Sequence, residues 1–206
     1  MNVNNFDSLY IVCIEASIEE LYKFSQEDML IKSFQTQYKQ FDVGEFYETE
    51  LHEKSPLEFL GAIFFQPLGV SNKTVVLGNS GGWATLCNYI CKNIGLRNTQ
   101  FDMNSENSPI KRNSLFVHEK GNQIRAVQAI INDFNNWEFT SRGIIMQYEN
   151  TNYYEKINIK ERLNKEILIE YCIKYGLNIL DDTFFNSNQK ALYIKRNTTK
   201  QNTTTR

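Results

Sequence analysis

The feature that most constrains the fold of this 206-residue chain is a change in the spacing of its apolar residues. Within residues 83–94 they recur at i, i+3, i+4, i+7, i+8 and i+11, which is the period of an α-helix with one buried face. Within residues 114–148 the period falls to two, as in strands whose two faces differ. The two patterns together predict a mixed fold in which helices cover a sheet.

The helical stripe belongs to the best-supported unit of the chain. Residues 74–77 are short and β-branched and predict a buried strand, and the glycine-rich run 78–82 predicts a sharp turn. The helix is then expected to begin at Trp83 and to stop at Gly95. The residues that we expect to be buried against the strands that follow are Trp83, Leu86, Ile90 and Ile94.

The first sixty residues predict strands and helices in alternation. Leu9 to Ile14 is an apolar run, and Ser17 with Glu20 forms a capping box that predicts a helix from Ile18. Residues 25–34 are expected to form a second helix and residues 38–51 a strand with an acidic flank. The apolar run 59–65 predicts a further strand or a short buried segment.

The second half predicts an antiparallel meander. Its four expected strands lie at residues 115–117, 124–131, 137–139 and 144–148, and Gly121-Asn122 is expected to form the first tight turn. A covering helix is expected over residues 158–175 and a last strand over residues 191–194. The predicted class is α+β, with N-terminal strand–helix units followed by the meander and a covering C-terminal helix. Residues 1–196 are expected to form one domain and residues 197–206 a polar, disordered tail.

Several residues between positions 82 and 176 stand in a distinctive order. They are Gly82-Trp83-x-x-Leu86, Trp137-x-Phe139, Gly143, Glu149, Tyr154, Ile159, Arg162, Leu168, Tyr171 and Gly176. This order resembles a group of uncharacterised bacterial proteins that carry a Gly-Trp-x-x-Leu helix start, a Trp-x-Phe hairpin and a C-terminal helix after an acidic loop. The resemblance covers about residues 74–177. It implies one shared domain and brings no activity with it.

Composition excludes several classes of protein. No apolar run approaches the roughly 18 residues of a membrane helix, and residues 1–17 contain no Lys or Arg, so we expect a cytoplasmic protein without a signal peptide. The four cysteines have apolar neighbours and form no Cys-x-x-Cys pair, which predicts buried thiols. With only two histidines, neither in a ligand spacing, no metal and no cofactor are expected. The acidic body is not expected to bind nucleic acid.

One pattern is typical of catalysis. Gly78-x-Ser80-x-Gly82 follows a predicted strand and precedes a helix, as in the nucleophile elbow of serine hydrolases. In that alternative Ser80 is the nucleophile, Asp102 the orienting acid and His118 the base. The simpler interpretation is that the glycines allow the turn and that Ser80 or Asn79 caps the helix. We therefore treat a small hydrolase as the second hypothesis.

Charge favours a binding function. Residues 1–60 hold twelve Asp or Glu and only four Lys or Arg, whereas residues 190–206 hold five basic residues and none that is acidic. Such an acidic segment attracts partners of opposite charge. The leading hypothesis is a non-enzymatic immunity or antidote protein that binds a basic protein, such as a toxin domain. The predicted contact residues are Glu45, Tyr47, Glu48, Glu50 and Glu53.

Overall fold

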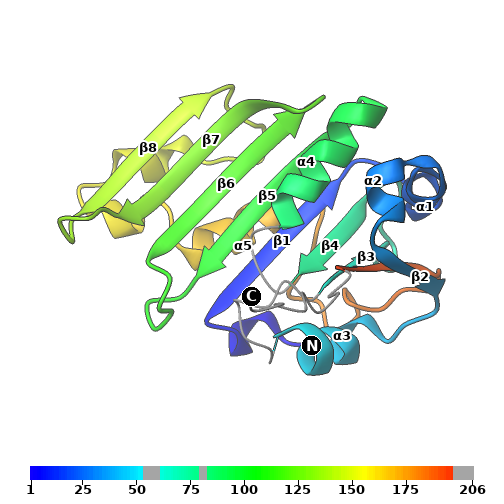
Figure 1. The fold of residues 1–206 in the computed structure, drawn as a ribbon. Helices are drawn as coiled ribbons and strands as arrows, with labels where there is room; N and C mark the ends of the chain where they lie inside the picture. The colour runs from blue at the N-terminus through cyan, green and yellow to red at the C-terminus, as the bar shows by residue number, and fades with distance from the viewer. Residues whose placement is uncertain (53–60, 79–82, 197–206) are drawn as a thin grey trace, which may run out of the picture.

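The computed structural model describes residues 1–52, 61–78 and 83–196, and nine strands of these residues form one sheet (Figure 1). In chain order the strands are β1 (Ser8–Ile14), β2 (Gln35–Lys39), β3 (Gly61–Phe65), β4 (Thr74–Gly78), β5 (Arg97–Asn104), β6 (Arg112–Glu119), β7 (Asn122–Ile131), β8 (Trp137–Gly143) and β9 (Ala191–Lys195). Their order across the sheet is β2-β9-β3-β4-β1-β5-β6-β7-β8, and every neighbouring pair is antiparallel. The fold is therefore mixed, with an antiparallel sheet, as the change of period indicates.

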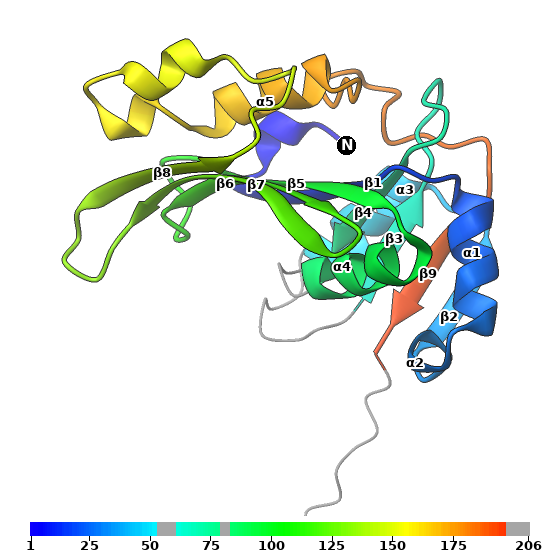
Figure 2. The same cartoon turned by 90° about the horizontal axis from the view of Figure 1, so that it is seen from above.

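Helices lie on both faces of this sheet (Figure 2). They are α1 (Ile18–Glu27), α2 (Met29–Lys32), α3 (Val43–Phe46), α4 (Trp83–Ile94) and α5 (Lys165–Lys174), with a π-helical stretch at Tyr47–His52 and 3-10 turns at Val3–Asn5, Thr151–Glu155 and Ile159–Glu161. In Figure 2, α5 lies on one side of the sheet and α1, α2 and α4 on the other. The side of β7 and β8 that faces away from α5 carries no helix among those drawn.

Each face of the sheet has its own apolar core. On the side of α5, residues such as Phe101, Leu115 and Leu168 are fully buried together. On the side of α4, Val76 and Ile90 belong to a second cluster that is built from α1, α2 and α4 on strands β1, β3, β4 and β9. The alternation of side chains along each strand separates the two clusters. Burial of apolar area on both faces stabilises the sheet and the helices on each side of it.

The predicted helix signals are confirmed where the caps are local. The hydroxyl of Ser17 accepts a hydrogen bond from the backbone N–H of Glu20 at 3.2 Å, and α1 begins at Ile18. Helix α4 begins at Trp83 and ends before Gly95, whose φ of 74° is the left-handed conformation that glycine adopts most easily. Leu86 and Ile90 are buried, and Ile94 is partly buried. Their side chains join the second apolar cluster with β1 and its neighbours, whereas the helix also lies against β5 and β6, so the predicted packing on the meander is confirmed only in part.

Three predicted segments are wrong. Residues 38–51 are helical from Val43, because the carboxylate of Asp42 accepts the N–H of Glu45 at 3.1 Å and starts α3. Residues 144–148 form no strand, and the fourth strand of the meander is β5, before the predicted ones. The tight turn after β6 uses positive φ at Lys120 and Gly121, not at Gly121 and Asn122.

The C-terminal helix begins later than predicted. Asn158 caps only the 3-10 turn that starts at Ile159, and Asn164 caps α5 by accepting the N–H of Ile167 at 2.9 Å. Strands that span residues 8 to 195 pair in the one sheet. The predicted tail, residues 197–206, lies outside the described residues.

Candidate functional site

The predicted contact residues gather on one helical segment, α3 with the π-helical stretch that continues it. Glu45 and Glu50 are exposed on this segment and Glu48 is partly exposed, with one carboxylate oxygen 4.0 Å from the amino group of Met1. The segment is anchored by Val43 and Leu51, which are 1% and 0% exposed. Burial of these two side chains leaves the carboxylates on the outer side.

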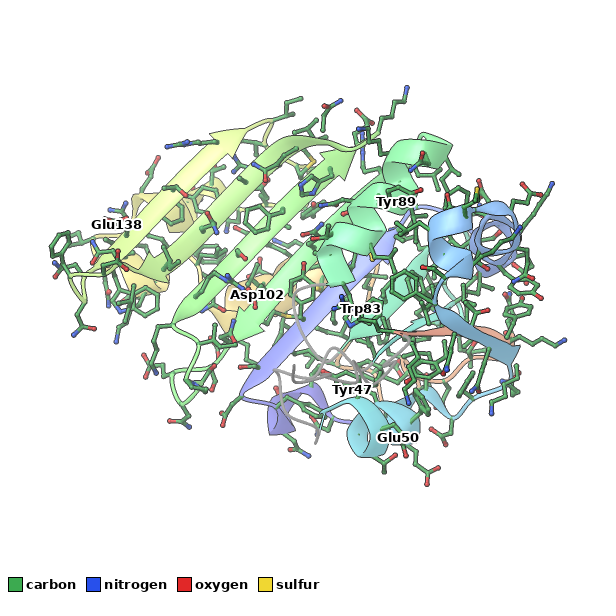
Figure 3. The ribbon with its side chains drawn as sticks, viewed as in Figure 1. Tyr47, Glu50, Trp83, Tyr89, Asp102 and Glu138 are labelled. Carbon is green, nitrogen blue, oxygen red and sulfur yellow. The ribbon has the colours of Figure 1, made fainter. Side chains whose placement is uncertain are left out.

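Tyr47 does not fit the predicted role. Its side chain is 3% exposed, and its ring packs edge-on against Phe6 with centroids 5.8 Å apart. Burial also raises the pKa of its hydroxyl. In Figure 3, Tyr47 lies on the side of the segment toward the sheet, and Glu50 lies on the far side. The prediction of Tyr47 as a contact residue is therefore corrected, and Glu53 lies outside the described residues.

A hollow of about 550 Å³ lies between this segment and the edge of the sheet at β2 and β9. Asp42, Glu45 and Glu50 line it from the helical side, and Lys39 and Lys195 line it from the strands. We call this feature the acidic hollow. Three aromatic side chains also line it, namely Phe41, Phe46 and Tyr193.

The aromatic side chains of the acidic hollow form a connected group. The rings of Phe46 and Tyr193 meet edge-on with centroids 4.9 Å apart, and those of Phe41 and Phe46 do the same at 4.9 Å. Gly61 on β3 makes room for Tyr193, because a Cβ atom there would overlap the tyrosine ring. Burial raises the pKa of Tyr193, and the nearby carboxylate of Glu50 raises it further. Aromatic rings and carboxylates thus lie side by side.

A row of polar side chains follows β5 on the face that carries α4. Asn98, Gln100, Asp102 and Asn104 alternate with residues 99, 101 and 103, of which the last two are apolar, and all four are buried. The side-chain carbonyl of Asn88 on α4 accepts hydrogen bonds from Asn98 at 3.0 Å and from Gln100 at 2.9 Å. Buried polar side chains cost stability unless each forms a hydrogen bond. The two contacts with Asn88 supply such bonds to Asn98 and Gln100. Residues 97–104 alternate with period two, a signal that the sequence interpretation missed.

Two residues of the hydrolase hypothesis lie on this face but do not meet. The carboxylate of Asp102 accepts hydrogen bonds from Nε of Arg112 at 2.6 Å and from Nδ2 of Asn104 at 2.8 Å. His118 on β6 stands opposite Asn98 on β5. Asn98 is four residues from Asp102 along β5, which is about 13 Å at the usual rise of a strand. Nδ1 of His118 is 3.4 Å from Nε2 of Gln100, and burial lowers the pKa of this histidine. Asp102 therefore pairs with Arg112 and not with His118. The predicted nucleophile, Ser80, lies outside the described residues.

A buried ion pair lies on the opposite face. The guanidinium of Arg125 donates to both carboxylate oxygens of Glu149, with Nη2 2.6 Å from Oε2. The same carboxylate accepts the hydroxyl of Tyr154 at 2.5 Å and the N–H of Met146 at 2.7 Å. The Tyr171 hydroxyl lies 3.3 Å from that of Tyr154. This network connects the segment after β8 to the sheet and to α5. We assign it a role in stability and not in binding or catalysis.

The cysteines provide no reactive site. All four are free and buried, and burial raises the thiol pKa of Cys13 to about 12 and that of Cys91 to about 11. A thiol with so high a pKa is a poor nucleophile and a poor metal ligand. Across residues 1–52, 61–78 and 83–196, no three His, Cys, Asp or Glu side chains are grouped to hold a metal ion.

Comparisons of the chain with protein-family models, with curated proteins and with solved structures each found no match. Among the described helices, none combines the length and the apolar character needed to cross a bilayer.

Proposed function

We propose that this protein is a cytoplasmic, non-enzymatic binding protein of the immunity or antidote kind, and that its acidic hollow binds a basic protein such as a toxin domain. The observation that carries the proposal is the joint placement of carboxylates and aromatic rings around one hollow. Asp42, Glu45 and Glu50 stand on one wall, beside Phe41 and Tyr193.

This combination suits an arginine or lysine side chain of the partner. A guanidinium or ammonium group gains from a carboxylate and from the face of an aromatic ring at the same time. The hollow contains one contact between a cation and an aromatic ring within the chain, because Nζ of Lys39 lies 5.0 Å from the centroid of the Phe41 ring. The partly exposed aromatic rings would lose further contact with water when a partner covers them.

The two lysines of the opposite wall add selectivity. Lys39 and Lys195 repel a cation that approaches from the strands, so a basic group of the partner is directed to the side of Glu45 and Glu50. Like-charge contacts across an interface disfavour wrong registers. The carboxylates raise the rate of association, and salt weakens this effect.

The test compares two variants of equal net charge. We expect the unchanged protein to capture one basic protein from the lysate of its native host at low salt, and less of it at high salt. Glu45→Gln with Glu50→Gln should reduce the captured amount by about tenfold, because both carboxylates are removed from the hollow. The matched control is Glu27→Gln with Glu106→Gln, two exposed carboxylates elsewhere, which should bind as the unchanged protein does.

A second measurement distinguishes an antidote from any other binding protein. If the captured partner is toxic when expressed alone, co-expression of the unchanged protein should restore growth, and co-expression of the Glu45→Gln, Glu50→Gln variant should not. Equal capture by both double variants, or no basic partner at low salt, would contradict the proposed function.

A further inference from the structure

We propose that β8 pairs with β8 of a second copy of this chain, antiparallel and centred on Thr140, so that two copies share one continuous sheet. The inference does not rest on the proposed function. The acidic hollow lies at the β2 edge of the sheet, and β8 is the opposite edge.

Strand β8 is a long edge strand. Its seven residues, Trp137 to Gly143, contain no Lys and no Pro, the residues that usually block pairing at an edge. The pairing of β8 with β7 is regular throughout. In Figure 1, β8 is the outermost strand at this end of the sheet. The other edge strand, β2, has only five residues and ends in Lys39.

The N–H and C=O groups of alternate residues of β8 are directed away from β7. The N–H of Ile144 donates to the carbonyl of Ile124 at 2.9 Å, and the N–H of Asn132 donates to that of Asn136 at 2.9 Å. Both bonds join residues that face each other across the two strands. Because hydrogen-bonded and non-hydrogen-bonded pairs alternate along an antiparallel ladder, the backbone groups of the even-numbered residues of β8 point toward β7. Those of Trp137, Phe139, Ser141 and Gly143 therefore point away from the sheet, as a ladder with a second strand requires.

In one register, strand β8 is complementary to itself. When Thr140 faces Thr140 of the second copy, Glu138 faces Arg142 of that copy, and each dimer contains this pair twice. Within the described residues, the guanidinium of Arg142 makes no ion pair of its own. On the other face Phe139 faces a serine, and Trp137 faces a glycine, so large side chains meet small ones.

Exposed apolar residues at both ends of β8 fit the same register. Ile144 and Ile145, just after the strand, are 65% and 58% exposed, and Phe134, in the turn before it, is 84% exposed. Antiparallel pairing brings the turn of one copy toward the isoleucines of the other. Exposed apolar side chains that gather at one edge are typical of a contact surface.

The test is a charge reversal followed by a compensating one, read by sedimentation velocity of the full chain at about 1 to 100 μM. We expect the unchanged protein to dimerise. Glu138→Arg alone and Arg142→Glu alone each place like charges opposite one another twice, and each should weaken the dimer by about tenfold or more. The double variant Glu138→Arg, Arg142→Glu restores opposite charges and should dimerise within about threefold of the unchanged protein.

The rescue distinguishes pairing between two copies from an effect within one chain. Glu138 and Arg142 are about 13 Å apart along one strand, so the two reversals do not compensate within one chain. Glu106→Arg, at an exposed carboxylate elsewhere, serves as the control for changed net charge. A monomer at every concentration would overturn the proposal, and any partner strand of β8 would then have to come from a different protein. A dimer that ignores both single reversals, or a double variant without rescue, would overturn it as well.

Discussion

At the residue scale, the buried pair of Arg125 and Glu149 is sensitive to the loss of either partner. Their side chains are 1% and 0% exposed, so each charge has lost its water and depends on the other. Such a pair adds little net stability, but removing one partner leaves an uncompensated buried charge. Gly143, Tyr154 and Tyr171 all lie at or beside this pair.

We expect Glu149→Ala to lower the free energy of unfolding by about 3–5 kcal/mol, because Arg125 then stays buried without its carboxylate. Urea unfolding followed by circular dichroism measures this loss. The control is Glu161→Ala, which removes an exposed partner of Lys156 at 3.7 Å and should cost no more than about 1 kcal/mol. Equal losses in the two variants would show that the buried network does not anchor the segment after β8.

His118 predicts a pH dependence. Burial lowers its pKa below the ordinary value of 6.5, so the unfolded chain binds the proton more readily than the folded one. Its contribution to stability is present above pH 6.5 and is lost as the pH falls toward the folded pKa. The difference in unfolding free energy between the unchanged protein and His118→Gln, measured from about pH 7.5 down to about 5, should show this step. A difference that is independent of pH would contradict it.

At the element scale, the sequence predicted well those elements whose signals are local. Ser17 and Gly95 mark helix ends, and the run at residues 74–77 is buried on both faces, so each is readable without knowledge of the fold. At residues 38–51 a local signal was overlooked, because the aromatic residues imitate a strand while the cap at Asp42 makes most of the segment helical. Other failures are non-local, since the partner strands of a segment cannot be read from its own residues.

The candidate site shows the same limit. The carboxylates of Glu45 and Glu50 could be found from the acidic run, because they lie close together in the sequence. Tyr193 could not, since it comes from β9, which reaches the acidic hollow only through pairing between β2 and β3. The choice of Tyr47 failed because an acidic flank says nothing about which side of a helix faces the core.

Helix α4 gives a prediction at this scale. Ile90 is 2% exposed in the cluster with Val12 and Val76, so Ile90→Ala should lower the free energy of unfolding by about 2–5 kcal/mol through lost apolar burial and an unfilled cavity. Thr85→Ala, at an exposed position of the same helix, should change it by less than about 0.5 kcal/mol. Chemical unfolding of the two variants checks the difference. A small loss for Ile90→Ala would mean that α4 contributes little to the fold.

At the scale of the whole molecule, the sheet separates the two proposed surfaces. Eight strand-to-strand steps of about 4.8 Å separate the β2 edge from the β8 edge by roughly 38 Å measured along the sheet. A dimer through β8 would therefore carry one acidic hollow at each end of a continuous sheet. Both hollows stay open in such a dimer, so a partner with two basic surfaces, or an array of partners, would be bound more tightly than by one chain alone.

This separation predicts that the two surfaces act independently. Mutations so far apart, with no shared contacts, have effects that add. Glu138→Arg should weaken dimerisation and leave the affinity of each chain for a soluble, monovalent partner within about twofold of the unchanged protein. Glu45→Gln with Glu50→Gln should do the reverse, since these carboxylates belong to the other edge. Titration calorimetry with the captured partner and sedimentation velocity measure the two effects in the same preparations. If Glu138→Arg weakened partner binding as strongly as dimerisation, the partner would contact β8 itself, and the assignment of the acidic hollow would have to be given up.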